Sequence, residues 1–467
     1  MKEKTNSRAI AFTVAAAFFM EMLDASIITT ALPAIGAAFG STALGVSASV
    51  TVYLVAMAVF VPAAGWCGER YGARRVFAAA VGVFTLASLL CGLAPSLAML
   101  IAARVLQGAA AAFMSPVGRF VVLRETPQNR IIEGIATITW PGLIAPVLGP
   151  PLGGFIVSHV SWHWIFLINV PLGALGIWLV LHFIPYRPPE RRAGFDAPGF
   201  VLTALALAAL VQGLSELGKR GGGWSLPLGL IAVGLVSGFA AVRHARRTAD
   251  PMLDLRALSV PTYALATARV GFPSRVAINA SPFLLPLMFQ IGFGMPPTQA
   301  GFMVLVYMVG NLTMKSATTA VLRRFGFRRV LIVNGALCVA TLIVCGLLSP
   351  GVPQPVIYAA LLAAGMTRSM NFTTVNTLAF ADVGADQRAG ASALATMLQQ
   401  VAMTLGVAFA AFALGVSQTL RGAPALELAD FRNVWFAVAA LMALAAFSAR
   451  RLHPSAGESV SGKRTKS

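Results

Sequence analysis

The sequence predicts an all-α polytopic membrane protein, and three observations support that fold class. Hydrophobic residues make up 57% of the 467 residues and charged residues only 11%, so a soluble fold would leave a large apolar surface in water. The apolar residues form runs of about 20 residues, long enough for a helix to cross ~30 Å of hydrocarbon. Most Lys and Arg residues fall in alternate gaps between these runs.

The first six predicted helices form one group, which ends at a basic, proline-containing stretch at 186–196. They occupy residues 10–32, 46–67, 76–94, 97–121, 132–157 and 163–184. In the fifth of these helices, prolines remove backbone donors and glycines permit close approach. We therefore expect a bend at a helix interface within 141–154, with tight packing and no moving part as the alternative.

Two further helices at 197–217 and 226–242 precede a second basic stretch, and a final group of six follows it. This last group occupies residues 262–291, 298–321, 329–348, 354–381, 389–416 and 432–449, which makes fourteen predicted helices. The predicted domains are a six-helix bundle at 1–185, cytoplasmic linkers with two extra helices at 186–261, a second six-helix bundle at 262–452 and a cytoplasmic tail, expected to be disordered, at 453–467.

The distribution of positive charge predicts the orientation of the chain. The gaps assigned to the outside hold few basic residues, namely Lys219, Arg220, Arg421 and Arg432, whereas the alternate gaps hold most of the 35 Lys and Arg residues. The positive-inside rule then places both termini in the cytoplasm. Although the net charge is +19, the basic residues are dispersed, so nucleic acid is not a predicted partner.

A basic motif occurs twice. The first copy follows the second predicted helix and contains Gly65, Glu69, Arg70, Gly72, Arg74 and Arg75, and the second follows the tenth and contains Arg323, Arg324, Gly326, Arg328 and Arg329. With Gly72 aligned to Gly326, the second copy has lost the acidic residue. Paired halves are the usual architecture of secondary transporters, with the substrate site between the halves near the midplane. Alternating access is therefore the leading hypothesis.

Three ionisable residues in the first group are candidates for proton coupling. Each charge inside a membrane helix costs ~2.5–3.5 kcal/mol, so its presence needs a functional or an ion-pairing explanation. Glu21 and Asp24 lie three residues apart, on one helical face, where a carboxylate can load and release protons. The helical rise places Asp24 and Arg104 at similar depths, ~10 Å from the outer boundary, so the two can form an ion pair. We predict Asp24 as the proton carrier, Arg104 as its modulator and Glu21 as a substrate or second proton site. A fixed, purely structural ion pair is the alternative.

Four basic residues lie inside the later predicted helices, namely Arg269, Arg275, Lys315 and Arg368. Arg269, Arg275 and Arg368, together with Glu21, are candidates for lining the substrate cavity. A purely cation-selective site is therefore not assured.

The sequence gives little support for enzymatic or nucleotide chemistry. His159 and His163 are spaced like metal ligands but lack a third ligand nearby, and the four cysteines fit small core residues, so we predict no metal, cofactor or catalytic residue. The nearest phosphate-loop match, at 213–219, is followed by Arg220 where Ser or Thr is required, which argues against a nucleotide partner. A membrane-embedded enzyme and a transporter-derived sensor remain remote alternatives.

Five segments together resemble the fourteen-helix drug:proton antiporter branch of the major facilitator superfamily, along nearly the whole chain. They are LDASIITTALP at 23–33, GWCGERYGARR at 65–75, RVLQG at 104–108, GPPLGG at 149–154 and SWHWIFLINVP at 161–171. In that family the second segment is a gating loop, the arginine of the third is implicated in proton transfer, and the fourth is an antiporter motif, here Gly149, Pro150, Gly153 and Gly154. Thr29 and Glu69 stand where the family usually has Asn and Asp.

The resemblance implies a major facilitator fold and proton-coupled export of small amphipathic or cationic compounds by alternating access. It implies a monomer in a bacterial cytoplasmic membrane, with protons, a small-molecule substrate and the lipid bilayer as partners, and a role in multidrug efflux. Export of a specific endogenous metabolite is the alternative.

Overall fold

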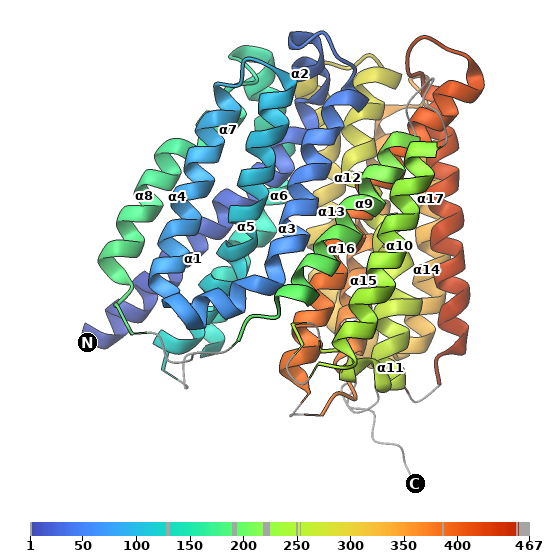
Figure 1. Cartoon of the computed structure of the whole chain (residues 1–467). Helices are drawn as coiled ribbons and strands as arrows, with labels where there is room; N and C mark the ends of the chain where they lie inside the picture. The colour runs from blue at the N-terminus through green and yellow to red at the C-terminus, as the bar shows by residue number, and fades with distance from the viewer. Residues whose placement is uncertain are drawn as a thin grey trace. The chain divides into compact units, whose positions relative to one another are not determined.

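The structure is a computed structural model, and its described part is built from long helices (Figure 1). It describes residues 2–127, 131–188, 194–217, 225–248, 251–252, 254–384, 387–453 and 456. The predicted tail at 453–467 lies outside the described residues except for His453 and Ala456. Outside them too lie Arg130, Arg191, Arg192, Lys219 and Arg220, and with them the end of the phosphate-loop match.

The first half of the chain contains helices α1 to α8, with a 3-10 turn, Ile28–Thr30, between α1 and α2. The helices are α1 (Lys2–Ile27), α2 (Leu32–Ala38), α3 (Ala43–Tyr71), α4 (Ala73–Gly92), α5 (Leu97–Glu125), α6 (Ile131–His159), α7 (Trp164–Leu167) and α8 (Asn169–Phe183). Side chains define some of the starts: the Thr42 hydroxyl accepts the Gly45 N–H before α3, and Ser96 accepts the Met99 N–H before α5.

The rest of the chain contains helices α9 to α17, with π-helical turns at Leu265–Arg269 and Met288–Gly292 on either side of α12. The helices are α9 (Ala197–Leu217), α10 (Ser225–Ala245), α11 (Pro261–Ala264), α12 (Gly271–Leu287), α13 (Pro297–Phe325), α14 (Phe327–Leu347), α15 (Gln354–Ala379), α16 (Arg388–Arg421) and α17 (Leu428–Ser448). A capping box of Glu427 and Asp430 starts α17.

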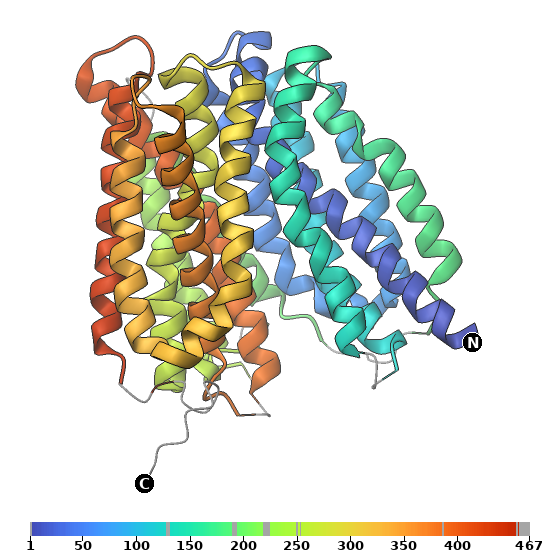
Figure 2. The ribbon, with the colours of Figure 1, turned by 180° about the vertical axis from the view of Figure 1, so that it is seen from behind.

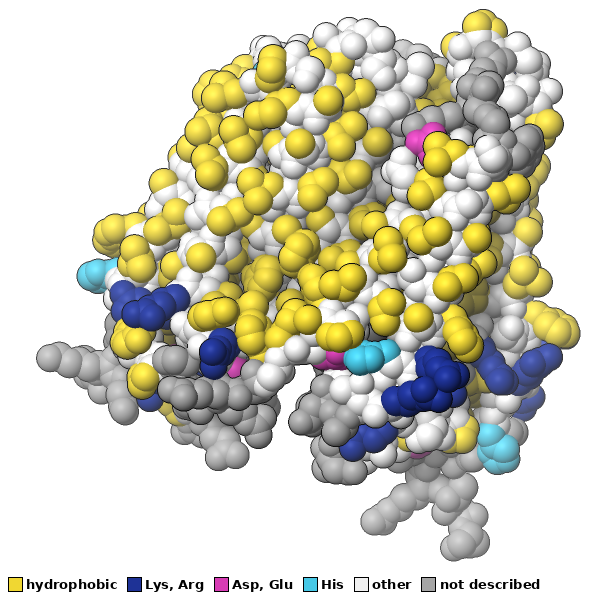
Figure 3. All heavy atoms as spheres, viewed as in Figure 1, with side chains coloured by type: hydrophobic (Ala, Val, Ile, Leu, Met, Phe, Trp, Pro, Cys, Tyr) yellow, Lys and Arg dark blue, Asp and Glu magenta, His cyan; other side chains and the backbone are white. Residues whose placement is uncertain are grey.

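The helices confirm the predicted all-α membrane fold. Within the described residues, eleven helices are long and apolar enough to cross a membrane, and helical segments at 261–292, 297–325 and 354–379 coincide with the other three predicted spans. Those three segments carry Arg275, Lys315 and Arg368. In Figure 3 apolar side chains cover the length of the helices, and Lys and Arg gather at one end of each unit.

Contacts divide the chain into two units. The first comprises Met1–Leu207 with Pro296–Phe302, and the second comprises Ala208–Met295 with Met303–Ser467. In the first unit α6 packs along α1, as both ribbon views show (Figures 1 and 2). The predicted domain boundaries at 185, 261 and 452 remain a prediction.

The repeated basic motif has the same local structure in both units. Gly72 joins α3 to α4 at φ 86°, and Gly326 joins α13 to α14 at φ 77°, a conformation that glycine adopts at little cost. Two residues later, Arg74 donates to the Leu181 carbonyl at the end of α8, at 2.5 Å. Arg328 donates to the Arg450 carbonyl after α17, at 3.2 Å. In each copy, an arginine thus ties the tight turn to the end of another helix of the same unit.

Helix α6 differs from the irregular segment that its prolines predict. It remains helical from Ile131 to His159 although four prolines lie within it. Its glycines pack directly against α1, as described below, and the bend predicted within 141–154 stays a prediction. Local proline rules are overridden here because neighbouring helices hold the segment in place.

Candidate functional site

Asp24 of α1 and Arg104 of α5 form a buried ion pair in the first unit. Arg104 Nη1 donates to Asp24 Oδ2 at 2.6 Å, and both side chains are fully buried. Helical rise predicts that the two residues lie at similar depth, and the structure brings them into contact. Breaking such a pair by removing one partner costs ~3–5 kcal/mol, because the other charge is left uncompensated.

Two amide side chains complete the surroundings of the Asp24 carboxylate. Gln107 Nε2 and Asn169 Nδ2 each donate to Asp24 Oδ1 at 2.8 Å. Gln107 also accepts from Arg104 Nη1 at 2.7 Å and donates to Ser88 at 2.8 Å. The carboxylate therefore has three donors on three sides, and the amides connect α1 to α4, α5 and α8.

Sequence reasoning did not select Gln107 or Asn169 as site residues. Gln107 lies three residues after Arg104 and hence on the same face of α5, and both residues fall inside the segments RVLQG and SWHWIFLINVP. The spacing in the first segment was a usable signal for Gln107. Asn169, at the start of α8, had no such signal, because its contact with Asp24 depends on how α8 packs against α1.

Tyr53 of α3 covers the other side of Arg104. The guanidinium carbon lies 4.1 Å from the centre of the Tyr53 ring, and Nε donates to the Ser49 carbonyl at 3.3 Å. Such a cation–π contact contributes more in a desolvated site than at a surface. Within the described residues Arg104 Nη2 has no hydrogen-bond partner, so the guanidinium keeps one donor available.

Glu21 lies one turn before Asp24 on α1 and is also fully buried. It does not share the partners of Asp24. The Ser115 hydroxyl of α5 contacts the two Glu21 carboxylate oxygens at 2.8 and 3.1 Å, and the charge of Arg119 acts on the same carboxylate. The two predicted acids therefore face one helix, α5, through separate sets of groups.

The predicted gating loop lies at the α3–α4 turn. Arg74 makes the bond to Leu181 described above, and the Arg75 guanidinium carbon lies 4.8 Å from the centre of the Tyr186 ring. Glu69 is half-buried, while Gly65 and Arg70 are exposed. The loop is thus fastened to the end of α8 by its basic residues, and its gating role remains a prediction.

The predicted antiporter motif forms the tightest helix contact of α1. A Cβ atom at Gly149 would overlap the Ser26 hydroxyl, and one at Gly153 would overlap the Thr30 hydroxyl. Gly154 and Pro150 lie against the start of α13, where Pro297 and Gly301 approach them with the same closeness. Glycine is required because any side chain would separate these backbones. The motif therefore positions the helix that carries Glu21 and Asp24.

The later basic residues belong to the second unit. Arg275 of α12 is buried and donates to Asn376 Oδ1 at 2.5 Å. Arg368 of α15 donates to Asn279 Oδ1 at 3.3 Å. Arg269 is exposed in the π-helical turn before α12. These three residues do not form one cluster with shared partners, and their assignment to a substrate cavity remains a prediction.

The chain belongs to the Major Facilitator Superfamily, whose family profile matches residues 14–407. It is therefore a multi-pass membrane transporter of small molecules and not an enzyme. It is 36% identical over 462 residues to an Escherichia coli O6:H1 protein named "Putative multidrug resistance protein MdtD", covering 97% of this chain and 96% of the relative. A Salmonella paratyphi B protein of the same name is 35% identical over 447 residues, covering 94% of each chain.

Solved structures with the same fold support this membership. A D-xylose–proton symporter matches with a TM-score of 0.69 at 14% identity, covering 97% of this chain and 98% of the symporter. An autoinhibited POT family peptide transporter matches with a TM-score of 0.66 at 15% identity, covering 96% and 97%. At these identities the likeness concerns the fold alone.

Proposed function

We propose that the protein is a proton-coupled antiporter that exports small amphipathic or cationic compounds by alternating access. The observation that carries the proposal is the fully buried Asp24 carboxylate, held by Arg104 and two amides. The names of the relatives, which refer to multidrug resistance, support export as the direction of transport. The proposed location is a bacterial cytoplasmic membrane, with both termini in the cytoplasm.

Proton coupling follows from the competition between Arg104 and a proton for the same carboxylate. While Asp24 is ionised, the ion pair holds α1 against α5. A proton on Asp24 removes the attraction and frees Arg104, which favours a conformation in which the two helices are less tightly joined. Conversely, a substrate-induced change that separates the pair favours uptake of a proton. One proton moved through 100 mV releases ~2.3 kcal/mol, which is available to drive export.

Glu21 is the second acid in this scheme. Its carboxylate is bonded to a hydroxyl rather than to a guanidinium, so its charge is less fully compensated than that of Asp24. We assign it to recognition of a cationic substrate or to a second proton. Export of one specific metabolite remains the alternative function, because none of these residues defines the shape of the compound.

The proposal is tested with purified protein in vesicles under an imposed pH gradient, with ethidium as the transported compound. D24N should abolish driven efflux while the protein stays monodisperse and helical. E133Q is the matched control, because Glu133 forms an ion pair with Arg8 at 2.8 Å in which both side chains are about half exposed. It should keep driven efflux close to wild type.

Retained driven efflux in D24N would remove Asp24 from the mechanism. Loss of efflux in both D24N and E133Q would also contradict the assignment, since the effect would then not depend on the buried pair.

A further inference from the structure

Positive charges in the interior of the second unit have no carboxylate beside them. Arg275, Lys315 and Arg368 lie on α12, α13 and α15, and the sequences of helices α12 to α16 contain no Asp or Glu. Asp430, near the start of α17, is already bonded to Arg421 at 2.5 Å. Arginine keeps its charge in proteins, and each charge at the centre of a membrane costs ~2.5–3.5 kcal/mol. The excess of positive charge therefore requires an explanation.

Lys315 and Arg368 lie near the middle of their helices. Lys315 precedes the end of α13 at Phe325 by ten residues, and Arg368 precedes the end of α15 at Ala379 by eleven. At 1.5 Å per residue, both lie ~15 Å from those ends, about half of the ~30 Å hydrocarbon thickness. Their two helices pack closely, with Gly310 of α13 against the Leu362 carbonyl of α15, and the charge of Arg368 acts on Lys315. Two like charges are thus held together at mid-membrane depth.

The protein itself compensates these two cations only weakly. Arg368 Nη2 donates to Asn279 Oδ1 at 3.3 Å, and the guanidinium carbon lies 6.0 Å from the Tyr307 ring centre. Arg368 Nε is buried and has no hydrogen-bond partner within the described residues. For the exposed Lys315 ammonium, the described part of the chain provides no hydrogen bond or ion pair. An amide and an aromatic face do not neutralise charge.

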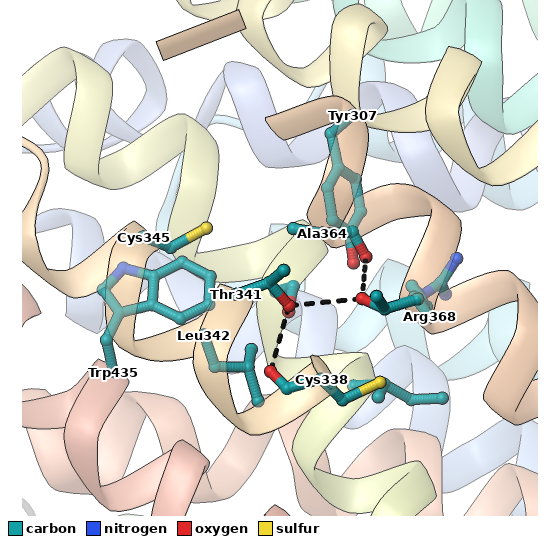
Figure 4. Close-up of a pocket in the computed structure, with 11 residues that line it drawn as sticks. Tyr307, Cys338, Thr341, Leu342, Cys345, Ala364, Arg368 and Trp435 are labelled. Carbon is teal, nitrogen blue, oxygen red and sulfur yellow. Dashed lines mark hydrogen bonds between the residues drawn. The ribbon is translucent and has the colours of Figure 1, made fainter. Parts of the chain in front are cut away.

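A small cavity lies beside Arg368. Tyr307, Thr341 and Thr367 line it with Arg368 (Figure 4), and its free volume of about 10 Å³ is about the least that can hold one water molecule. The Thr341 and Thr367 hydroxyls lie 3.2 Å apart and point to the same space. The wall next to the guanidinium thus offers hydroxyl groups and no acid.

Arg275 differs from Lys315 and Arg368 in its burial, although it also forms no ion pair within the described residues. It is 1% exposed and bonded to Asn376, so it joins α12 to α15 in a place closed to other molecules. Lys315 is exposed and Arg368 partly exposed. Of the three, these two are the ones with exposed surface.

We propose that Arg368 and Lys315, assisted by Asn279, bind the carboxylate of an organic anion that the protein exports. A carboxylate accepts two parallel hydrogen bonds from a guanidinium, and its single negative charge offsets one of the two positive charges and lowers their mutual repulsion. The site extends the proposed substrate class to organic anions. The inference rests on the proposed export function for its biological role, but binding does not require a proton gradient.

The test is binding to purified full-length protein in detergent at neutral pH. Carboxyfluorescein serves as the anionic probe and ethidium as the cationic probe, with fluorescence polarisation as the readout. R368Q and K315Q should each weaken carboxyfluorescein binding by about tenfold or more and leave ethidium binding unchanged or tighter. R324Q, on the exposed end of α13, is the matched control that removes the same charge and should change neither affinity more than about twofold.

One further variant and one fallback keep the outcome decisive. R368K keeps the positive charge but not the two parallel donors of a guanidinium, so its affinity for carboxyfluorescein should lie between those of wild type and R368Q. If R368Q fails to fold, the exposed K315Q carries the test alone. Binding is measured on wild type without a pH gradient, so loss of this site and loss of proton-driven efflux are read in separate assays.

The proposal is overturned if wild-type protein does not bind carboxyfluorescein. The proposal is also overturned if R368Q and K315Q bind carboxyfluorescein with wild-type affinity, or if R324Q weakens carboxyfluorescein binding as much as they do.

Discussion

The two units contain similar arginine–tyrosine contacts with different charge balance. Arg104 lies over Tyr53 in the first unit, and Arg368 faces Tyr307 in the second. Tyr307 corresponds to Tyr53 when the two glycine turns are aligned. The helix that completes the first contact is α1, which supplies the carboxylate of Asp24, whereas α12 supplies only an amide. Both units thus have the arginine–tyrosine contact, but only the first unit places a carboxylate beside the arginine, within the described residues.

Backbone packing beneath both arginines is nearly the same. Gly108 on α5 lies against the Tyr53 carbonyl, and Gly365 on α15 lies against the Tyr307 carbonyl, each so closely that a Cβ would overlap the oxygen. Arg104 precedes its glycine by four residues, and Arg368 follows its glycine by three. The same helix–helix contact therefore carries an arginine at two different places. The close backbone contact therefore requires the glycine and places it against the tyrosine, whereas the position of the arginine can differ between the two units.

The largest expected effect is the difference in stability between the variants that remove Arg104 and Arg368. R104Q should destabilise the protein by ~3–5 kcal/mol, because Asp24 is left buried without its cation. R368Q should cost much less or stabilise the protein, because no carboxylate is left behind. Thermal unfolding of the two variants in the same detergent measures the difference.

The double variant D24N/R104Q is the control for this comparison, since it removes both charges and should recover part of the stability that R104Q loses. Equal destabilisation by R104Q and R368Q would contradict the inferred difference in charge compensation between the two arginines.

Removal of one amide at the Asp24 site should have a somewhat smaller effect. Q107L takes a donor from Asp24 and an acceptor from Arg104, and we expect a net loss of ~1.5–3 kcal/mol, because Asp24 and Arg104 keep their bond to each other. The variant should lose stability in that range and lose driven ethidium efflux in part. Q212L is the matched control, since Gln212 bonds Glu216 at an exposed position, at 2.8 Å. A Q107L protein that behaves like Q212L would exclude Gln107 from the site.

The shared backbone contact can be tested with two alanine variants. G108A and G365A each place a methyl group on a tyrosine carbonyl, and overpacking of this kind costs ~1–3 kcal/mol. We expect similar losses in melting temperature for the two variants, because both helix pairs pack with the same closeness. A large loss in one and none in the other would indicate that only one of the units depends on this contact.

Most of the fold could be predicted from the sequence, because apolar runs of membrane length and the basic turns between them are local signals. The same is true of the Asp24–Arg104 contact, since helical rise alone puts the two residues at one depth. Asn169 could not be predicted, because it is an ordinary polar residue whose partner lies 145 positions away. The continuous α6 could not be predicted either, since its prolines suggest interruption and only the packing against α1 holds it helical.

In the second unit, the sequence predicts which residues are unusual but not which groups surround them. Four basic residues could be marked as unusual from sequence, but their surroundings differ in ways that spacing does not reveal. Arg275 is enclosed and bonded to Asn376, Arg269 is exposed, and the charges of Lys315 and Arg368 act on each other. A buried charge is visible in a sequence, while the presence or absence of its partner is a property of the packed helices.

The smallest expected effect concerns the exposed ion pair that precedes α11 in the second unit. The Arg256 side chain holds the pKa of Asp254 below its ordinary value of 3.8 through hydrogen bonds of 2.7 to 3.0 Å. A lowered pKa in the folded state stabilises the protein above pH 3.8, and this contribution is lost as the pH falls through the folded-state pKa. Because Arg256 is mostly exposed, solvent screening limits the gain to less than about 1 kcal/mol. Wild type should therefore melt slightly above D254N at pH 7, and the difference in melting temperature should shrink as the pH falls below 3.8. A difference that grows as the pH falls would contradict the assignment.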